Sequence, residues 1–294
     1  MTEVLQQAIN AVSLGATYAL LALGLAMVFN ILGLVNFAHG ELLTVAAYAM
    51  YGAYQVGLPF GVQVVLGVLA AMAAGVAMER IAFRPLRGAS FAALLFASFA
   101  VGVIIQNIFR AAVSPRQEPL PFPGVFNEVV QVADLTIGWL QIITTLITVI
   151  ALIALTTFLR RTVQGLGMLA SSQDFEIARS VGVRANRVVA MAFAISGALA
   201  ALAAISIVAR RGTVDPTMGF EPVIAALIGT VIGGLGSLSG AAFGGFLLGI
   251  LEVSFDASLP DSLQPYSQAF TLALVIAILY FRPRGLLEKV VEER

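Results

Sequence analysis

The chain has no cysteine, one histidine and one lysine among its 294 residues. Without cysteine there can be no disulfide bond, thiolate metal site or cysteine nucleophile. With His39 alone, a zinc motif built on two histidines is excluded, and a single histidine remains that could act as a general base. Valine follows Lys289, so the phosphate-binding pattern G-x-x-x-x-G-K-[ST] cannot be written anywhere in the chain. We therefore expect no metal, no cofactor and no enzyme active site.

Charge is also scarce. Only 11% of the residues are charged and 60% are apolar, and the mean hydropathy is +0.97. A soluble domain gives about 25% of its residues to charge, so this chain could not cover a water-facing surface. The composition predicts an integral membrane protein. Residues 1–4 carry no basic signal-peptide region, so we expect the first apolar run to be retained as a span.

Charge-free runs predict where the chain crosses the bilayer, because a spanning helix needs about 20 apolar residues. Single spans fit residues 88–109, 135–159, 188–209 and 262–281. Three runs are too long for one span and must turn: residues 4–40, 42–78 and 222–251. Their turns are expected at residues 30–36, 57–61 and 233–237, where glycine, proline and asparagine gather. The predicted fold is an all-α polytopic bundle formed by residues 1–294, with nine spans, or eight if one broken run is re-entrant.

Arginine and lysine in the loops predict the orientation. Twelve of them lie in residues 80–87, 160–187 and 282–294, against four on the opposite side. These three segments are expected to be cytoplasmic. The C-terminus then lies on the cytoplasmic side of an inner membrane and, with nine spans, the N-terminus lies outside. Residues 114–136 are then an external loop whose proline-rich first half should not be helical. Residues 162–187 form a cytoplasmic segment.

This cytoplasmic segment carries the pattern of a short helix. Residues 171–174 match an N-capping signature and Gly182 stands where the helix would stop. About ten residues span about 15 Å, which is too short to cross a bilayer. Apolar residues share one face (Ala170, Ile177, Ala178 and Val181), and polar ones share the other (Gln173, Glu176, Ser180 and Arg184). From periodicity alone this is an interfacial linker helix or a docking helix for a partner.

Polar residues also fall between apolar runs. Asn36, His39 and Glu41 either line a solute path, where unwound backbone borders a cavity, or cap a turn at interface depth. Glu252 is expected at the interface, because Asp256 four residues later already belongs to an aqueous segment. The glycine-rich stretch with Gly233, Gly236, Gly240 and Gly244 predicts close helix packing or a hinge.

Three segments together resemble the branched-chain amino-acid (LivH-type) permease family of ABC transporters. They are residues 165–183 (GLGMLASSQDFEIARSVGV), 33–42 (GLVNFAHGEL) and 233–245 (GGLGSLSGAAFGG). The resemblance implies that the first segment is a coupling helix that docks on a separate ATPase subunit. The residues it implicates are Ser172, Gln173, Asp174, Glu176, Arg179 and Gly182. The family usually has arginine where this chain has Leu166 and Leu169, so either Arg179 and Arg184 carry the charge pairing or the partner is less acidic.

The expected function is therefore that of a permease subunit in an ATP-driven importer for branched-chain or other amino acids. The resemblance implies a second related permease, two ATPase subunits and an external solute-binding protein, and no nucleic acid. Urea and short amides remain alternative substrates. A transporter or channel driven by an ion gradient is the alternative class, and a membrane scaffold without transport ranks last.

Overall fold

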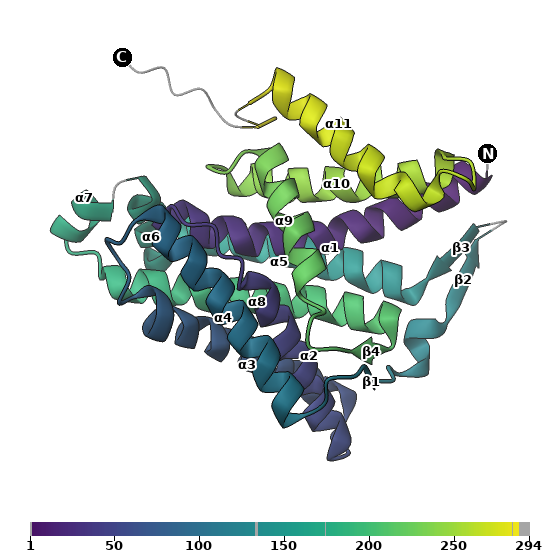
Figure 1. The fold of residues 1–294 in the computed structure, drawn as a ribbon, viewed down its shortest axis with the longest axis horizontal. Helices are drawn as coiled ribbons and strands as arrows, with labels where there is room; N and C mark the ends of the chain where they lie inside the picture. The colour runs from purple at the N-terminus through teal and green to yellow at the C-terminus, as the bar shows by residue number, and fades with distance from the viewer. Residues whose placement is uncertain (1, 133–134, 174, 284, 288–294) are drawn as a thin grey trace.

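The computed structural model describes residues 2–132, 135–173, 175–283 and 285–287, and these are predominantly helical (Figure 1). The α-helices are α1 (Thr2–Leu32), α2 (His39–Gln55), α3 (Phe60–Met78), α4 (Phe91–Ala112), α5 (Trp139–Arg161), α6 (Val163–Gln173), α7 (Phe175–Ser180), α8 (Ala185–Arg211), α9 (Phe220–Gly233), α10 (Leu238–Ser258) and α11 (Ser267–Phe281). A π-helical turn, η1 (Glu79–Phe83), extends α3, and two 3₁₀ turns are η2 (Gly124–Asn127) and η3 (Gln264–Tyr266). The expected all-α class is confirmed.

All three predicted turns lie where the long runs were expected to break. The chain leaves α1 at Leu32 and enters α2 at His39, and it turns between α2 and α3 and between α9 and α10 at the other two sites. Seven described helices are long and apolar enough to cross a membrane. The helices α2 and α9 have 17 and 14 residues, and the latter spans about 21 Å. The expected count of eight or nine spans therefore stays a prediction.

Short strands lie at one end of the bundle. In the segment 114–136 and just after it, β2 (Val129–Val132) and β3 (Leu135–Gly138) form an antiparallel hairpin. The strand β1 (Glu118–Pro119) pairs with β4 (Thr213–Val214), which follows α8. Residues 114–123 contain no helix, as their prolines predict. The hairpin lies beside the N-terminus, and α6 and α7 lie at the opposite end of the bundle (Figure 1).

The loop that joins α1 to α2 has the same geometry as the loop that joins α8 to α9. Gly33 and Gly212 end the preceding helices with φ of 65° and 67°, a conformation that side chains rarely adopt. Both glycine amides donate to the carbonyl four residues earlier at 2.7 Å. The side-chain oxygens of Asn36 and Asp215 then accept from the backbone amide two residues later, both at 3.0 Å. Each loop is therefore the same Asx turn feeding a short buried helix.

These two loops meet at their ends. A Cβ on Gly40 would lie 2.1 Å from the carbonyl oxygen of Gly219, and a Cβ on Gly219 would lie 2.0 Å from that of Gly40. Contacts at such distances leave room only for hydrogen on either α-carbon. The backbones of α2 and α9 therefore touch at their first turns.

The helices around these loops pack in matching pairs. Gly249 of α10 lies against Gly15 of α1, and Gly75 of α3 lies against Phe193 of α8. The guanidinium of Arg210, at the end of α8, donates to Ser13 Oγ near the start of α1 at 2.6 Å, so α1 and α8 run antiparallel. The contacts of α1 to α3 with α8 to α10 are therefore reciprocal, as in an inverted repeat, and we call these two segments the inverted repeats. Inverted repeats of this kind are a common design of transporters.

Glycine also sets the contact between α9 and α10. A Cβ on Gly233 would lie 1.8 Å from the Gly240 carbonyl oxygen, and one on Gly244 would lie 2.0 Å from that of Gly229. Gly236 is exposed in the turn between the two helices. Small residues at these contacts let the helix backbones approach closely.

An ion-pair cluster lies at the C-terminal end of α3, around the π-helical turn η1. The Glu79 side chain is fully buried and pairs with Arg84 at 2.8 Å and with Arg87. Hydrogen bonding to Glu79 raises the pKa of the Arg84 guanidinium. Arg87 also donates to Asn186 in α8, so the cluster joins the ends of two helices.

The meeting of the two loops predicts a matched pair of stability effects in α2. Gly40→Ala should destabilise the protein by about 2 kcal/mol, because the added methyl group overlaps the Gly219 backbone. Gly52→Ala should be neutral or slightly stabilising, because nothing lies within 4 Å of its Cβ position and alanine is the better helix former. Thermal unfolding in detergent measures both. Equal melting temperatures for the two variants would contradict the contact.

Candidate functional site

A cavity of about 550 Å³ lies against the first turn of α2, and we call it the Glu41 cavity. Its walls come from the end of the α1–α2 loop, from α4, and from the segment between α8 and α9. The side chains that line it include Phe37, Glu41, Gln106, Arg211, Asp215 and Met218. Its size falls in the range usual for small-molecule sites.

Glu41 is the buried acid of this cavity. The residue is 2% exposed, and Oε1 accepts a hydrogen bond from Gln106 Nε2 of α4 at 2.7 Å. The Thr44 hydroxyl, one turn later in α2, also lies close to the carboxyl group, although Oε2 has no well-aligned hydrogen bond. Among the described residues, the carboxyl group has no ion-pair partner. Gly102 of α4 lies beside the Glu41 side chain, since a Cβ on Gly102 would lie 3.7 Å from Glu41 Cγ.

The other charges of the cavity come from the second inverted repeat. Arg211 Nη2 lies 3.1 Å from Glu221 Oε2, and Arg211 Nη1 lies 4.0 Å from Asp215 Oδ2. The hydroxyl and amide of Thr217 both donate to Asp215 Oδ1, which holds this carboxylate in its turn. The cavity therefore joins one arginine with three carboxyl groups.

A second cavity lies on the other side of the α1–α2 loop, with a volume of about 900 Å³. We call it the arginine cavity, because Arg87, Arg179, Arg184 and Arg187 line it. Leu94 of α4 faces this cavity, whereas Ser98 and Phe99 one turn later face the Glu41 cavity. Between the two, the Phe37 amide donates to Ser98 Oγ at 3.3 Å and the rings of Phe37 and Phe99 stack at 4.3 Å. These contacts separate the two cavities.

Of the three residues expected near a path, Glu41 alone lines either cavity. His39 is fully buried, and its Nδ1 lies 2.9 Å from Ser196 Oγ of α8. Its ring packs on α1, where a Cβ on Gly24 would lie 2.6 Å from His39 Cε1. Asn36 uses its oxygen for the turn, and its buried Nδ2 has no partner among the described residues. Asn36 and His39 therefore fix the loop that presents Glu41.

Sequence reasoning missed the partners of Glu41. Gln106 was a visible signal, since it is a polar residue inside an otherwise apolar predicted span. Arg211 and Asp215 were assigned to an aqueous loop by their charge alone. Arg211 is exposed, in agreement with that assignment, but the loop then runs inward to Met218 and Gly219, which are buried. No feature of residues 210–221 taken alone indicates this inward course.

The family model described as "Branched-chain amino acid transport system / permease component" matches residues 7–279. The chain belongs to this permease family. The family expected from the three motifs is therefore confirmed.

Curated relatives match the permease along nearly its whole length. BraD of Pseudomonas aeruginosa, a high-affinity branched-chain amino acid transport system permease protein, is 34% identical over 96% of this chain and 95% of its own. LivH of Escherichia coli K12, with the same description, is 32% identical over 96% and 95%. LivM of the same organism, another permease protein of such a system, is 27% identical over 95% of this chain and 69% of its own.

The described helices of residues 162–187 differ from the helix that was expected to begin at residues 171–174. The segment forms α6 and α7, and Ser171 and Ser172 lie in the last turn of α6. Their hydroxyls donate at 2.8 Å to the carbonyls of Gly167 and Leu169, so the N-cap expected of them is wrong. The physical reason is that α6 continues through these serines to Gln173. Asp174 and the side chain of Glu176 lie outside the described part of the chain.

The end of this segment agrees with the sequence. Gly182 follows α7 with φ of 93°, so the helix stops near the expected residue. Gln173 and Arg179 are exposed on the surface of the segment. Leu166 is 52% exposed, whereas Leu169 is partly buried and packs on the core.

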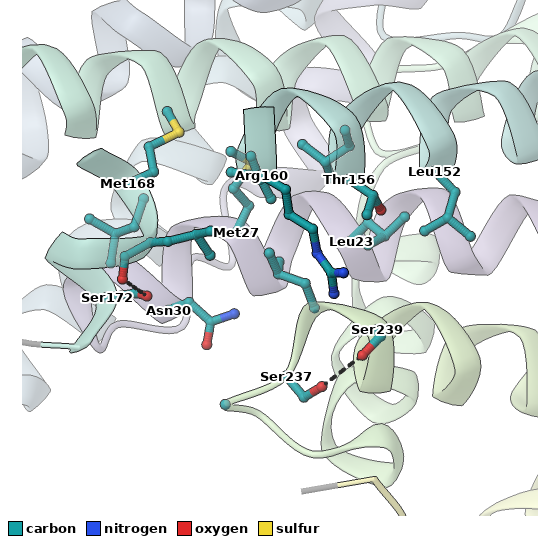
Figure 2. A pocket seen from close by; sticks show the side chains of 16 residues that line it. Leu23, Met27, Asn30, Leu152, Thr156, Arg160, Met168, Ser172, Ser237 and Ser239 are labelled. Carbon is teal, nitrogen blue, oxygen red and sulfur yellow. Dashed lines mark hydrogen bonds between the residues drawn. The ribbon is translucent and has the colours of Figure 1, made fainter. Parts of the chain in front are cut away.

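A third cavity, of about 300 Å³, connects this segment to the membrane helices (Figure 2). Ser172 of α6 lines it together with Asn30 of α1, Arg160 of α5, and Ser237 and Ser239 at the α9–α10 turn. Figure 2 shows the Arg160 side chain reaching across the cavity from α5. Ser237 Oγ and Ser239 Oγ lie 3.2 Å apart. The helix α6 and the α9–α10 turn therefore border one shared space.

Gly102 offers a test of the Glu41 cavity as a site of function. Gly102→Ala adds a methyl group at ordinary contact distance from Glu41 and should leave transport within about twofold of wild type. Gly102→Leu fills the space beside Glu41 and should lower transport by about tenfold or more. Uptake by the assembled transporter, compared at equal expression, measures both. Equal uptake by both variants would show that the transported solute does not pass through this cavity.

Proposed function

We propose that the permease forms half of the membrane pathway of an ATP-driven importer, and that the Glu41 cavity is the outer part of the route. One observation carries this proposal, namely a buried carboxyl group that lines a cavity where two inverted repeats meet. A charged group at membrane depth is costly and usually functional. Val103 of α4 borders the cavity and is 55% exposed, so a second related permease has a surface on which to complete the wall.

We also propose nine crossings, counting α2 and α9, with the C-terminus in the cytoplasm. Gln6 near the N-terminus exchanges two hydrogen bonds with the backbone of Thr136, at 2.8 and 3.0 Å. The N-terminus therefore shares a side with the segment 114–136, which the distribution of arginine assigns to the exterior. An N-terminus outside and a C-terminus inside require an odd number of crossings.

The proposed substrate is an amino acid with an apolar side chain. The relatives are named for branched-chain amino acids, and the walls of the Glu41 cavity combine charged groups with Phe37, Phe99 and Met218. Such walls suit a small zwitterion with a hydrocarbon side chain better than urea or a short amide. A solute-binding protein would deliver the substrate at the outer face.

ATP hydrolysis is proposed to occur on two partner subunits that dock on residues 162–187. The docking residues are Ser172, Gln173, Asp174, Glu176, Arg179 and Gly182. Arg179 lies both on this surface and on the arginine cavity, so it joins the docking surface to the inner end of the route. Because Leu169 is turned inward, only Leu166 among the two leucines would meet the partner directly. The glycine turn with Gly233, Gly236, Gly240 and Gly244 would move with α6 across the cavity of Figure 2.

The ion-gradient alternative has less support. A proton relay needs titratable groups in line, and His39 is sealed between α1 and α8 away from Glu41's cavity. Glu252 of α10 lies on neither cavity.

A charge reversal tests the coupling. Arg179→Glu should lower ATP-dependent uptake of labelled leucine into vesicles about tenfold, because it places a like charge against an acidic partner surface. Arg161→Glu is the matched control, since Arg161 is an exposed arginine at the end of α5, directly before this segment and outside the proposed docking residues. ATP-dependent uptake that is equal in the two variants would contradict the docking assignment. Uptake that ignores ATP but follows an ion gradient would contradict the function.

A further inference from the structure

We propose that Glu41 is the counter-ion for a primary ammonium group of the transported solute. The permease itself would then recognise the α-ammonium group of an amino acid during transport through the membrane, in addition to any selection by a solute-binding protein. This inference rests on the proposed function and makes its substrate class specific.

The first argument is the missing counter-charge. Glu41 is buried, and the described donors beside its carboxyl group are neutral, namely the Gln106 amide and the Thr44 hydroxyl. No cation among the described residues forms an ion pair with it. Burying a carboxylate is costly unless a cation and further donors compensate it. Elsewhere in the molecule the buried carboxylate of Glu79 has two arginine partners. An ammonium group in the cavity would supply to Glu41 both the charge and the donors that Glu79 already has.

The second argument is the balance of charge around the cavity. Arg211 is the lining cation, and Glu221 and Asp215 already engage its guanidinium. With Glu41 the lining carries three carboxyl groups against one guanidinium, and Arg110 of α4 adds one further positive charge that acts on Glu41 from outside the lining. A solute that carries only a carboxylate is therefore repelled, and a solute with an ammonium group is attracted. Urea has no charge to pair with Glu41.

The third argument is the surface beside the carboxyl group. Phe37 and Phe99 stack on each other and line the same cavity, together with Val103 and Met218. These side chains offer an apolar wall for a hydrocarbon side chain, and aromatic faces also favour a nearby ammonium group. The cavity thus suits a branched aliphatic amine or amino acid.

Three related probes test the inference directly. They are leucine, 3-methylbutylamine, which lacks the carboxylate, and 4-methylpentanoate, which lacks the ammonium group. The purified full-length permease in phospholipid nanodiscs is titrated with each probe, and saturation-transfer NMR reports binding in the millimolar range. Leucine and 3-methylbutylamine should bind, and 4-methylpentanoate should bind about tenfold more weakly or not at all.

Glu41→Gln removes the charge but keeps the shape and the oxygen that accepts from Gln106. It should weaken the binding of leucine and 3-methylbutylamine by about tenfold or more. The binding of 4-methylpentanoate should not weaken, because one of the charges that repel its carboxylate is removed. Asp256→Asn, which removes an exposed carboxylate of α10 outside this cavity, is the control for net charge and should bind as wild type does. Thermal unfolding of each variant verifies folding, and Glu41→Asp, which restores the charge, should regain part of the binding.

Three results would overturn the inference. The first is equal binding of 4-methylpentanoate and 3-methylbutylamine, and the second is binding of leucine and 3-methylbutylamine that Glu41→Gln does not change. The third is an absence of binding by all three probes. Reconstituted ATP-dependent leucine uptake, measured separately, tells this failure from failure of the proposed function. If uptake persists although the binding test fails, the proposed function is supported and the ammonium site is not. If the amines bind in a manner that depends on Glu41 but ATP-dependent uptake is absent, the ammonium site is supported and the proposed function is contradicted.

Discussion

The arrangement of the permease depends on one backbone contact, the approach of Gly40 to Gly219. A side chain on either residue would push apart the first turns of α2 and α9, and with them the two repeats. Breaking two helices inside an apolar bundle would normally leave polar backbone groups without partners. The two Asx turns, built on Asn36 and Asp215, satisfy these groups locally and let both short helices start deep in the protein.

The position of Glu41 follows from that contact. Because α2 starts at the centre, its first turn carries a carboxyl group to a depth where a carboxylate needs compensation. The facing repeat brings Arg211 and Asp215 to the same cavity, and α4 adds Gln106. On the other side of the loop the arginine cavity has the opposite charge, and the Phe37 and Phe99 rings stand between the two. The charge of the lining residues thus changes sign from one cavity to the other, across the stacked rings of Phe37 and Phe99.

The sequence predicts the parts of this fold that depend on local chemistry. Run lengths and turn residues located all three breaks, and Gly182 located the end of α7, because glycine and proline act on the backbone where they stand. The matching residues of GLVNFAHG and GTVDPTMG were present but too short to reveal a repeat without the contact between them. The inward course of residues 215–219 depends on the packing of Gly219 against α2, and the serines expected to cap a helix lie inside one. Local preference gave way to tertiary context in both places.

The absence of cysteine allows the barrier between the two cavities to be tested with single introduced thiols. Val103→Cys places a thiol on the Glu41 cavity, and Asn186→Cys places one on the arginine cavity. In vesicles of known orientation, a membrane-impermeant maleimide should label Cys at position 103 only from outside and Cys at position 186 only from the cytoplasmic side. Labelling of position 103 from the cytoplasmic side, or of both positions from one side, would contradict a route closed at the meeting of the two loops.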